Sequence, residues 1–333
     1  MNTQKTIKRP TMKMVAERSG VSVATVSFVL SGRPSGKVAA SPGTAARVRA
    51  AAEELGYRPN QAARAIRTGR SGLVLLSLTH LSDPWCHSVS DAVNQAAAGQ
   101  NLQPLILADG DWGAVLDGQP VDAAFLDDAR EADLPRIEQL VRRGLRLIVF
   151  SHDLEPDGFD VIRNPQREGC ALAMDYLLSK HDRIGCLTGS EEGKPGWHRE
   201  HAYFEALTQA GIEPVPEYFQ RYTLDHAGVY AAALRMLDRD NPPSAIFTTS
   251  DFAAINAINV AIGLGMSVPD DLAVMGVGNT REAAEIQPSL TSVGPTNFFS
   301  DLAELIIRVA QRPDDHRPTF HEFPWSVHVR DSA

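Results

Sequence analysis

The chain has few cysteines and no long apolar run. Cys86, Cys170 and Cys186 are widely separated and form no CxxC pair, which favours buried thiols in a reducing compartment and predicts no zinc site. No stretch of about 18 apolar residues is present, and the N-terminus, MNTQKTIKRP, lacks the apolar core and cleavage site of a secretory signal. We therefore expect a cytoplasmic protein without membrane contact.

The charge of the chain is unevenly distributed. The formal net charge is -9, but residues 1–70 contain 13 basic and three acidic residues, a net +10, whereas the remainder contains 19 basic and 38 acidic residues, a net -19. With 333 residues, 43% of them hydrophobic, the chain suits a small basic head and a larger two-lobed body. A basic end suits approach to nucleic acid, although a charge run is usually just a solvated surface.

Residues 11–30, TMKMVAERSGVSVATVSFVL, predict two short helices joined by a tight turn. Thr11 is placed to cap the first helix, Gly20 to end it and Ser22 to cap the second, along which apolar residues recur at helical spacing. Helices joined by so short a turn form a helix-turn-helix, whose second helix fits the major groove of DNA. From this pattern alone, any other small helical pair is an equally good interpretation.

A third helix and a short arginine-containing segment follow. Ser41, Pro42 and Gly56 bracket a helix whose apolar face would complete a very small core. The next segment, QAARAIRTG, has too few apolar residues to fold alone, so a plain linker is one interpretation of it.

The stretches TMKMVAERSGVSVATVSFVLSGRP and SPGTAARVRAAAEELGYRPNQAARAIRTGRSG resemble the N-terminal part of the LacI/GalR family of bacterial transcriptional repressors. The resemblance rests on the run VAxxxGVSxxTVSxVL followed by LGYxPNxxARxI. It implies a homodimer on a palindromic operator in double-stranded DNA, and a hinge helix in which Ile66 replaces the family's Leu as a minor-groove wedge. The DNA-facing candidates are Thr11, Ser22, Val23, Ala24, Thr25, Ser27, Phe28, Asn60, Ala63, Arg64 and Ile66.

Phe28 departs from the family in the second helix, which the resemblance makes the recognition helix. Many relatives have Arg after TVS, where it reads guanine, and Phe cannot donate a hydrogen bond to a base edge. Two interpretations stay open: Phe28 packs inward in the head, or its ring contacts a thymine methyl in the groove, as Val23 and Ala24 also can. We expect the second, and hence a half-site that depends on thymine at this position.

From Gly72 onward, short apolar runs alternate with longer amphipathic ones. The runs LVLLSL, LQPLILA, DAAFLD, LRLIVFS, IGCLTG, SAIFTTS and LAVMGV predict buried parallel strands, each followed by a helix, which is a doubly wound α/β pattern. The resemblance implies a two-lobed, periplasmic-binding-protein-like body after an all-α helix-turn-helix head. The expected divisions are a head (1–58), a hinge helix and linker (59–70) and a body (71–333), with lobe one at about 71–163 and 294–321 and lobe two at about 164–293 and 322–330.

Ligands of open α/β sheets bind at the carboxyl ends of strands, so polar and aromatic residues just after strands are candidates for an effector site. Arg199 matches the family's effector-binding arginine, and its guanidinium suits a carboxylate, a phosphate or vicinal hydroxyls. Trp85 either stacks on a ligand ring or caps the core. Gly278 stands where the family has a ligand-binding Asp, which argues against an unmodified sugar site. The effector candidates are His80, Trp85, Cys86, Ser151, Arg199, Thr223, Ser250, Asp251 and Gly278.

The resemblance implies a DNA-binding repressor whose affinity for DNA is modulated by a small-molecule effector. Three alternatives remain: a regulator that needs no effector, an enzyme that gathers residues such as His80, His152 and His198 at the cleft, and a solute-binding protein. The histidines are scattered without a nucleophile motif, and a solute-binding protein would lack the basic head. We expect no catalytic site, no cofactor and no metal.

Overall fold

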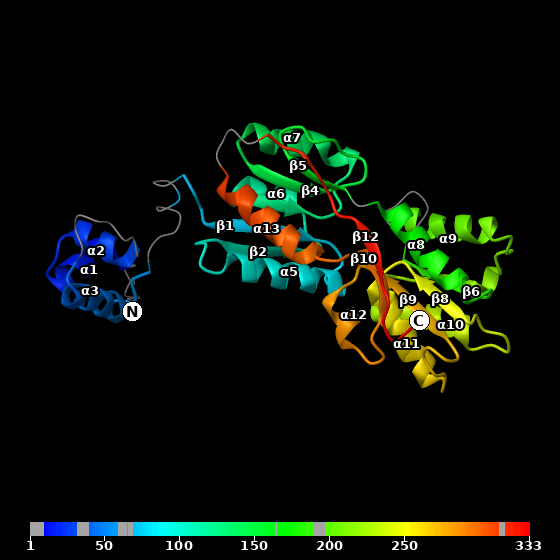
Figure 1. Cartoon of the computed structure of the whole chain (residues 1–333). Coiled ribbons are helices and arrows are strands. Elements are labelled where there is room, and N and C mark those ends of the chain that lie inside the picture. The colour runs from blue at the N-terminus through cyan, green and yellow to red at the C-terminus, as the bar shows by residue number, and fades with distance from the viewer. Residues whose placement is uncertain are drawn as a thin grey trace, which may run out of the picture. The chain divides into compact units, whose positions relative to one another are not determined.

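A computed structural model describes residues 10–31, 40–58, 65, 69–163, 165–189, 197–312 and 317–333. The chain divides into two compact units, Met1–Ser71 and Gly72–Ala333, each described here by itself (Figure 1). The first unit contains the head, and the second is the body. The candidate DNA-facing residues Asn60, Ala63, Arg64 and Ile66 lie outside the described residues. Among the described residues, no helix is both long and apolar enough to cross a membrane.

The described part of the head consists of three short helices, α1 (Met12–Ser19), α2 (Val23–Ser31) and α3 (Pro42–Glu54). The hydroxyl of Thr11 accepts a hydrogen bond from a backbone N–H in the first turn of α1 at 3.4 Å, and Gly20 ends this helix with a left-handed φ of 68°. The hydroxyl of Ser22 accepts a hydrogen bond from the first turn of α2 at 3.1 Å. The predicted pair of helices and its tight turn are therefore confirmed.

The head is held together by a small apolar core. Val15, Val26, Val29 and Val48 are buried where the three helices meet. The exposed guanidinium of Arg18 lies 2.8 Å from the carboxylate of Glu54 and joins α1 to α3. Exposed ion pairs contribute at most about 1 kcal/mol, so burial of the valines provides most of the stabilisation.

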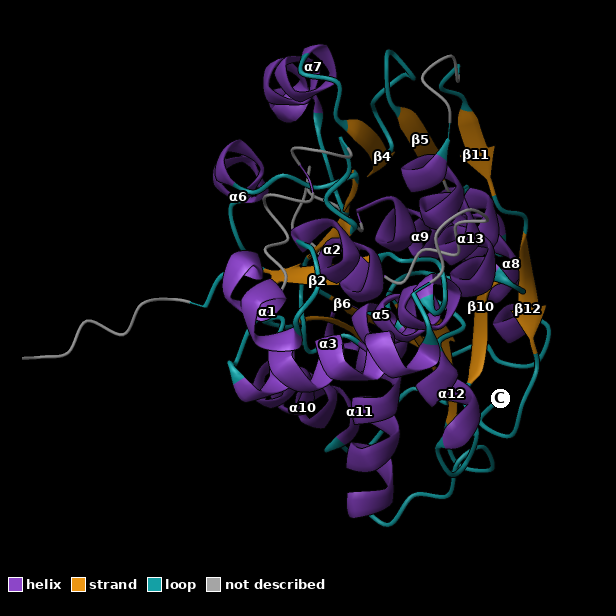
Figure 2. Ribbon diagram, turned by 90° about the vertical axis from the view of Figure 1, so that its left-hand side faces the viewer, coloured by secondary structure: helices purple, strands orange, loops and turns teal. Residues whose placement is uncertain are grey.

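The body consists of two lobes, each built on one sheet (Figures 1 and 2). The first lobe contains β1 (Leu73–Leu78), α5 (Pro84–Ala97), β2 (Gln103–Ala108), α6 (Trp112–Gly118), β3 (Ala123–Leu126), η1 (Glu131–Asp133), α7 (Leu134–Arg142), β4 (Arg146–Phe150), β5 (Asp160–Arg163), α13 (Phe298–Gln311) and β11 (Phe320–Glu322). The second lobe contains α8 (Gln166–Leu178), β6 (Ile184–Thr188), α9 (Trp197–Gln209), η2 (Pro216–Tyr218), β7 (Phe219–Arg221), α10 (His226–Leu237), β8 (Ala245–Thr248), α11 (Asp251–Gly263), β9 (Ala273–Val277), α12 (Arg281–Glu285), β10 (Thr291–Pro295) and β12 (Trp325–His328).

Both sheets have helices on both faces. The strand orders are β11-β5-β4-β3-β1-β2 and β12-β10-β9-β8-β6-β7, and all pairs are parallel except β10 with β12. In the first lobe, α5 and α13 cover one face and α6 and α7 the other, while in the second lobe α10 and α11 lie opposite α8 and α9. Strands β3, β6 and β9 are buried at every residue, which is why they read as continuous apolar runs. The predicted two-lobed α/β body is confirmed.

The chain crosses between the lobes after β5, after β10 and after β11. Two of the expected lobe boundaries, at residues 294 and 322, differ from the observed pairing. Gly294 and Pro295 pair with β12 and so belong to the second lobe, and Glu322 pairs with Arg163 in the first. These boundaries depend on strand pairing between distant segments, which no local sequence pattern reveals.

Close packing of α8 against β12 leaves no room for a side chain at Gly169. A β-carbon built at this position would overlap the ring of Trp325. At Gly263, near the end of α11, the same added atom would meet nothing within 4 Å. The two glycines are therefore a matched pair, one packed and one open.

We predict that Gly169→Ala lowers the free energy of unfolding by about 1 to 3 kcal/mol, because the added methyl group forces α8 away from Trp325. Gly263→Ala should leave stability unchanged or raise it slightly, since alanine is the better helix former. Urea unfolding of the two variants measures both effects. Equal stabilities would contradict the packing described for α8.

Candidate functional site

A cleft of about 430 Å³ lies where the carboxyl ends of strands from both lobes meet. Residues that follow β1 and β3 and the end of β4 line it from the first lobe, and residues that follow β6, β7, β8 and β9 line it from the second. The volume is in the range of small-molecule sites. Five of the predicted effector residues line this cleft: His80, Trp85, Arg199, Ser250 and Gly278.

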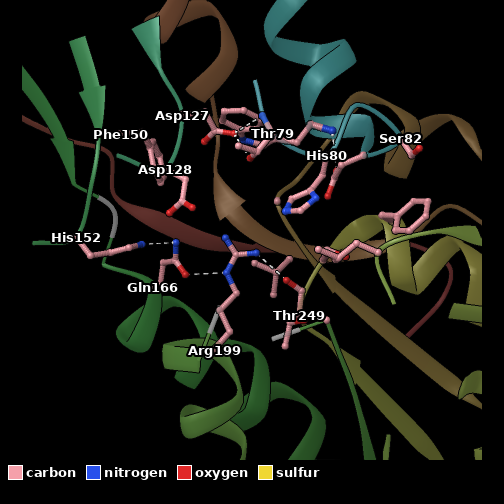
Figure 3. Close-up of a pocket in the computed structure, with 18 of the residues that line it drawn as sticks. Thr79, His80, Ser82, Asp127, Asp128, Phe150, His152, Gln166, Arg199 and Thr249 are labelled. Atoms are coloured by element: carbon pink, nitrogen blue, oxygen red, sulfur yellow. Dashed lines mark hydrogen bonds between the residues drawn. The ribbon is translucent and has the colours of Figure 1, made fainter. Parts of the chain in front are cut away.

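Arg199 is fixed by two hydrogen bonds within the second lobe. Its Nε donates to Oε1 of Gln166 at 2.8 Å, and its Nη1 donates to the backbone oxygen of Thr249 at 2.6 Å. The amide nitrogen of Gln166 lies 2.8 Å from Nε2 of His152, a residue of the first lobe that follows β4 (Figure 3). The guanidinium is thus held at the cleft wall by contacts that extend across the two lobes.

Two predicted effector residues, Cys86 and Ser151, are buried behind the first lobe's side of the cleft. The thiol of Cys86 is 1% exposed and donates to the backbone oxygen of Thr79 at 3.0 Å, and burial raises its pKa. The hydroxyl of Ser151 accepts hydrogen bonds at 3.3 Å from the backbone N–H groups of Asp153 and Leu154. We revise both assignments, because these side chains shape the wall rather than face the cleft.

The other two, Thr223 and Asp251, also lie outside the lining. Thr223 is exposed, and its neighbour Tyr222 lines the cleft in its place, with its hydroxyl 3.2 Å from that of Ser250. Asp251 is 1% exposed, and its carboxylate is engaged by Thr280 and Ser292. Burial and these partners give Asp251 a structural role.

Burial changes the acidity of the groups in the first lobe's side of the cleft. Burial, with a smaller effect from the charge of Asp251, raises the pKa of Asp83 to about 6. The hydrogen bond that Asp83 accepts from the backbone N–H of Trp85 acts in the opposite direction. Burial also raises the pKa of Asp127 to about 6, although Asp127 accepts two hydrogen bonds from Thr79 at 3.2 and 2.7 Å.

His152 shows the opposite shift, since its charged form is a cation. Burial, together with the neighbouring Arg199 and His198, lowers the pKa of His152 to about 4. At neutral pH the imidazole is therefore uncharged, and it pairs with Gln166 as a neutral group.

An aromatic wall, Trp85 with Phe150 and Phe298, borders the carboxylates. The ring centroid of Trp85 lies 6.1 Å from that of Phe150 and 6.3 Å from that of Phe298, and all three rings line the cleft. Trp85 thus packs against the core and lines the cleft as well, and its stacking on a ligand ring stays a prediction.

Several lining residues were not among the candidates. Asp127 and Asp128 directly follow a predicted strand. A position just after a strand was the criterion for the other candidates, so the same criterion could have identified these two carboxylates. Gln166 and Phe298 begin helices just after the chain crosses between lobes, where no predicted strand precedes them.

Comparison with known proteins decides the family. A sequence profile described as bacterial regulatory proteins, lacI family, matches residues 11–60, and one for a periplasmic binding protein-like domain matches residues 174–333. Over 320 residues the chain is 30% identical to the HTH-type transcriptional repressor PurR of Pectobacterium carotovorum subsp. carotovorum (strain PC1), with 92% of each chain covered. The chain belongs to the LacI family.

Other similarities agree with this assignment. The chain is 27% identical over 330 residues to the HTH-type transcriptional repressor CytR of Escherichia coli (strain K12), covering 95% of this chain and 94% of CytR. Its fold is similar to that of a lac repressor dimer bound to operator and the anti-inducer ONPF, with a TM-score of 0.72, 20% identity and coverage of 98% and 99%. As a LacI-family member, the chain is a DNA-binding transcriptional regulator.

The start of α2 is the exposed part of the helix that this LacI-family head would present to DNA. Ser22 and Ala24 are exposed, and the side chain of Val23 is 45% exposed. Thr25 and Ser27 are half-buried. Phe28 is also half-buried and packs against the head's core, as the alternative interpretation of this residue states. This packing favours the inward interpretation of Phe28, and contact of its ring with a thymine methyl stays a prediction that the structure does not test.

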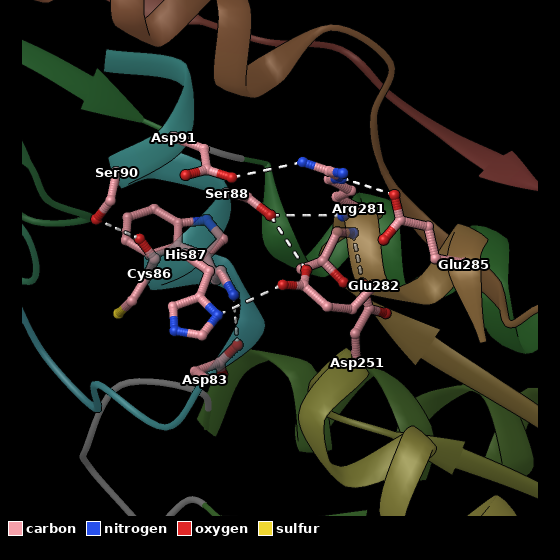
Figure 4. Close-up of polar contacts among 12 residues, drawn as sticks. Asp83, Cys86, His87, Ser88, Ser90, Asp91, Asp251, Arg281, Glu282 and Glu285 are labelled. Atoms are coloured by element: carbon pink, nitrogen blue, oxygen red, sulfur yellow. Dashed lines mark hydrogen bonds and ion pairs between the residues drawn. The ribbon is translucent and has the colours of Figure 1, made fainter. Parts of the chain in front are cut away.

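Helix α5 of the first lobe contacts α12 of the second (Figure 4). The backbone N–H of Arg281 donates to the hydroxyl of Ser88 at 3.4 Å, and its guanidinium lies 3.5 Å from the carboxylate of Asp91. The hydroxyl of Ser88 lies 3.5 Å from the carboxylate of Glu282. Because α5 begins at the cleft, where Asp83 caps it, one helix connects the ligand-facing wall to this interlobe contact.

We predict that Asp83→Asn stabilises the protein by roughly 1 to 2 kcal/mol at pH 7.5 and has little effect at pH 4. A carboxyl whose pKa is higher in the folded protein than in the unfolded chain costs stability as the pH rises from about 4 through about 6. Asparagine removes this cost and still caps a helix. Urea unfolding at the two pH values measures the difference.

Asp111→Asn is the matched control. Asp111 also caps a helix, α6, but it is exposed to solvent. Its substitution should change stability by a similar, small amount at both pH values. A gain at Asp83 that does not depend on pH would show that burial of the carboxylate is not its cause.

Proposed function

We propose that this chain is a homodimeric transcriptional repressor that binds a palindromic operator, and that a small molecule in the interlobe cleft changes its affinity for DNA. The observation that carries the proposal is the presence in one chain of a family-matched helix-turn-helix head and a body with a ligand-sized cleft. The names of the relatives PurR and CytR support repression. Such a protein acts on DNA in the cytoplasm and needs no cofactor or catalytic residue.

Recognition of the operator rests on the exposed N-terminal part of α2. One three-helix head reads too few bases for specific binding, and a two-fold dimer doubles the contacts, which gives the operator its palindromic form. Val23 and Ala24 are the exposed apolar residues at this end, and apolar side chains read the methyl group of thymine. Contacts with phosphates come from the net +10 charge of residues 1–70.

Residues 59–70 serve as the hinge in this proposal. Asn60, Ala63 and Arg64 contact the DNA, and Ile66 wedges into a central minor-groove step, where an unstacked step bends the duplex and adds specificity. The head then comprises residues 1–58 and the body residues 71–333.

The body couples the ligand to DNA binding through the relative position of its lobes. A molecule that contacts Arg199 on one side and Asp128 on the other favours one arrangement of the lobes over another. Allosteric coupling of this kind typically amounts to about 1 to 3 kcal/mol, or a roughly 5- to 150-fold change in DNA affinity.

We predict that selection from a random DNA library returns a palindrome whose half-sites contain a thymine read by Val23. Replacing that thymine with uracil removes one methyl group and should weaken binding about threefold to fourfold, the effect of losing about 0.8 kcal/mol of apolar contact. Fluorescence anisotropy with the selected operator measures this loss. It should also show affinity falling steeply with salt.

The control is a comparison of two variants. Val23→Ala should bind the thymine and uracil operators equally, whereas Phe28→Ala should keep the preference for thymine and lower the thermal stability of the head. Failure of the library to return any palindrome would contradict the proposed function. If only Phe28→Ala lost the preference for thymine over uracil, the ring of Phe28 and not Val23 would be the group that contacts the thymine methyl.

We predict that Arg199→Ala abolishes the response of DNA binding to the effector without weakening operator affinity in the absence of ligand. The reason is that Arg199 lines the cleft in the body, and the operator contacts lie in the head and hinge. Anisotropy titrations with and without the effector measure both quantities. Arg167→Ala is the matched control, since Arg167 is exposed and pairs with Glu205 away from the cleft. A full response in Arg199→Ala would show that the site has been misplaced.

A further inference from the structure

Three carboxylates in the lining of the cleft each keep an open hydrogen-bond acceptor. In the carboxylates of Asp83, Asp127 and Asp128, one oxygen of each accepts a hydrogen bond from the protein. In the part of the chain that the structure describes, no group donates to the second oxygen of any of the three. Asp128 and Arg199 approach the same space from opposite sides (Figure 3).

The lining of the cleft contains both acidic and basic groups. Three acidic side chains share it with two arginines, Arg130 and Arg199, and two histidines, His80 and His152, of which His152 is uncharged at neutral pH. Arg130 is exposed and pairs with Asp128 at 2.8 Å, whereas Arg199 is bound to neutral groups. Neither Asp83 nor Asp127 forms an ion pair with any described residue. Asp83 and Asp127 are therefore half-buried carboxylates without an ion-pair partner among the described residues, although Arg199 and His80, beyond ion-pair distance, lower the pKa of Asp83.

The third feature is the aromatic wall formed by Trp85, Phe150 and Phe298. The face of an aromatic ring carries negative charge density and attracts cations, most strongly where water is excluded. These rings line the same cleft as the carboxylates. Together they provide acceptors, negative charge and polarisable surface on the first lobe's side.

We propose that the effector is a small organic cation, whose ammonium group lies between the carboxylates of Asp83 and Asp127 and whose oxygen acceptor is bound by Arg199. This inference rests on the proposed function, because it names the class of effector for the same cleft. An anionic ligand would add to the repulsion among the carboxylates. A neutral polyol would fill the acceptors but leave the half-buried carboxylates of Asp83 and Asp127 without an ion-pair partner.

Ligand pairs that differ in charge but little in shape test this inference. The pairs are choline with 3,3-dimethylbutan-1-ol, and D-glucosamine with D-glucose and D-glucuronate, extended by other primary, tertiary and quaternary amines with their neutral isosteres. Thermal unfolding of the full chain is followed at pH 7.5 and constant ionic strength, since a bound ligand raises the Tm by mass action. We expect at least one amine to raise the Tm and to bind at least tenfold more tightly than its neutral isostere.

Variants then assign the contact. Asp127→Asn should weaken binding of that amine at least tenfold and change binding of the neutral isostere much less, because the amide still accepts the hydrogen bonds from Thr79. Asp83→Asn is a second variant with the same expectation and a retained helix cap. Asp111→Asn, in the same lobe but outside the lining, should bind the amine as the wild type does.

The inference is wrong if no amine in the set raises the Tm, or if a neutral or anionic partner binds as tightly as its cation. Operator binding distinguishes this failure from that of the proposed function. A protein that binds a palindromic operator and responds to an anion contradicts only the cationic effector. A protein that selects no operator contradicts the repressor itself, whichever ligand its cleft binds.

Discussion

The buried carboxylate of Asp251 is the constraint on which the second lobe's side of the cleft depends. It accepts hydrogen bonds from the backbone N–H and hydroxyl of Thr280 at 2.7 and 2.9 Å and from the hydroxyl of Ser292 at 2.6 Å. A carboxylate withdrawn from water needs such donors. They join the start of α11 to the β9–α12 turn and to β10, while Gly276 and Gly278 leave room for the carboxylate. Asp251, which the sequence analysis gave as an effector-binding candidate, thus supports the wall of the cleft from behind.

The two sides of the cleft differ in their chemistry and in how firmly they are held. On the second lobe, hydrogen bonds to Gln166 and to the backbone of Thr249 hold the guanidinium of Arg199 in a fixed position. On the first lobe, the carboxylates of Asp83 and Asp127 keep open oxygens and lie beside an aromatic wall. A ligand therefore meets a pre-organised donor on one side and unsatisfied acceptors on the other. Selectivity is expected to arise from the first lobe, because its groups gain most from a partner.

Long-range pairing explains most of the difference between what the sequence predicts and what the structure contains. The seven apolar runs become strands, whereas β5, β7, β10, β11 and β12 were not among the predicted runs, and β11 and β12 pair with segments far away in the chain. Arg199 could be found from its motif and Asp127 from its place after a strand. Gln166 could not, because its role comes from a contact with a residue of the other lobe. Phe28 was expected in the DNA groove, because the sequence pattern does not reveal that its ring packs against the core of the head.

The contacts between α5 and α12 bear on how easily the lobes separate. Their hydrogen bonds and ion pairs span 3.4 to 3.6 Å, and they include the exposed Arg281 with Asp91 and the exposed His87 with Glu282. Exposed pairs of this kind contribute little, typically about 0 to 1 kcal/mol each. The contact between α5 and α12 therefore contributes little to holding the lobes together. A ligand shifts the lobes only by as much as it binds one arrangement more tightly than the other, and a contact this weak adds little to the difference that the ligand must overcome.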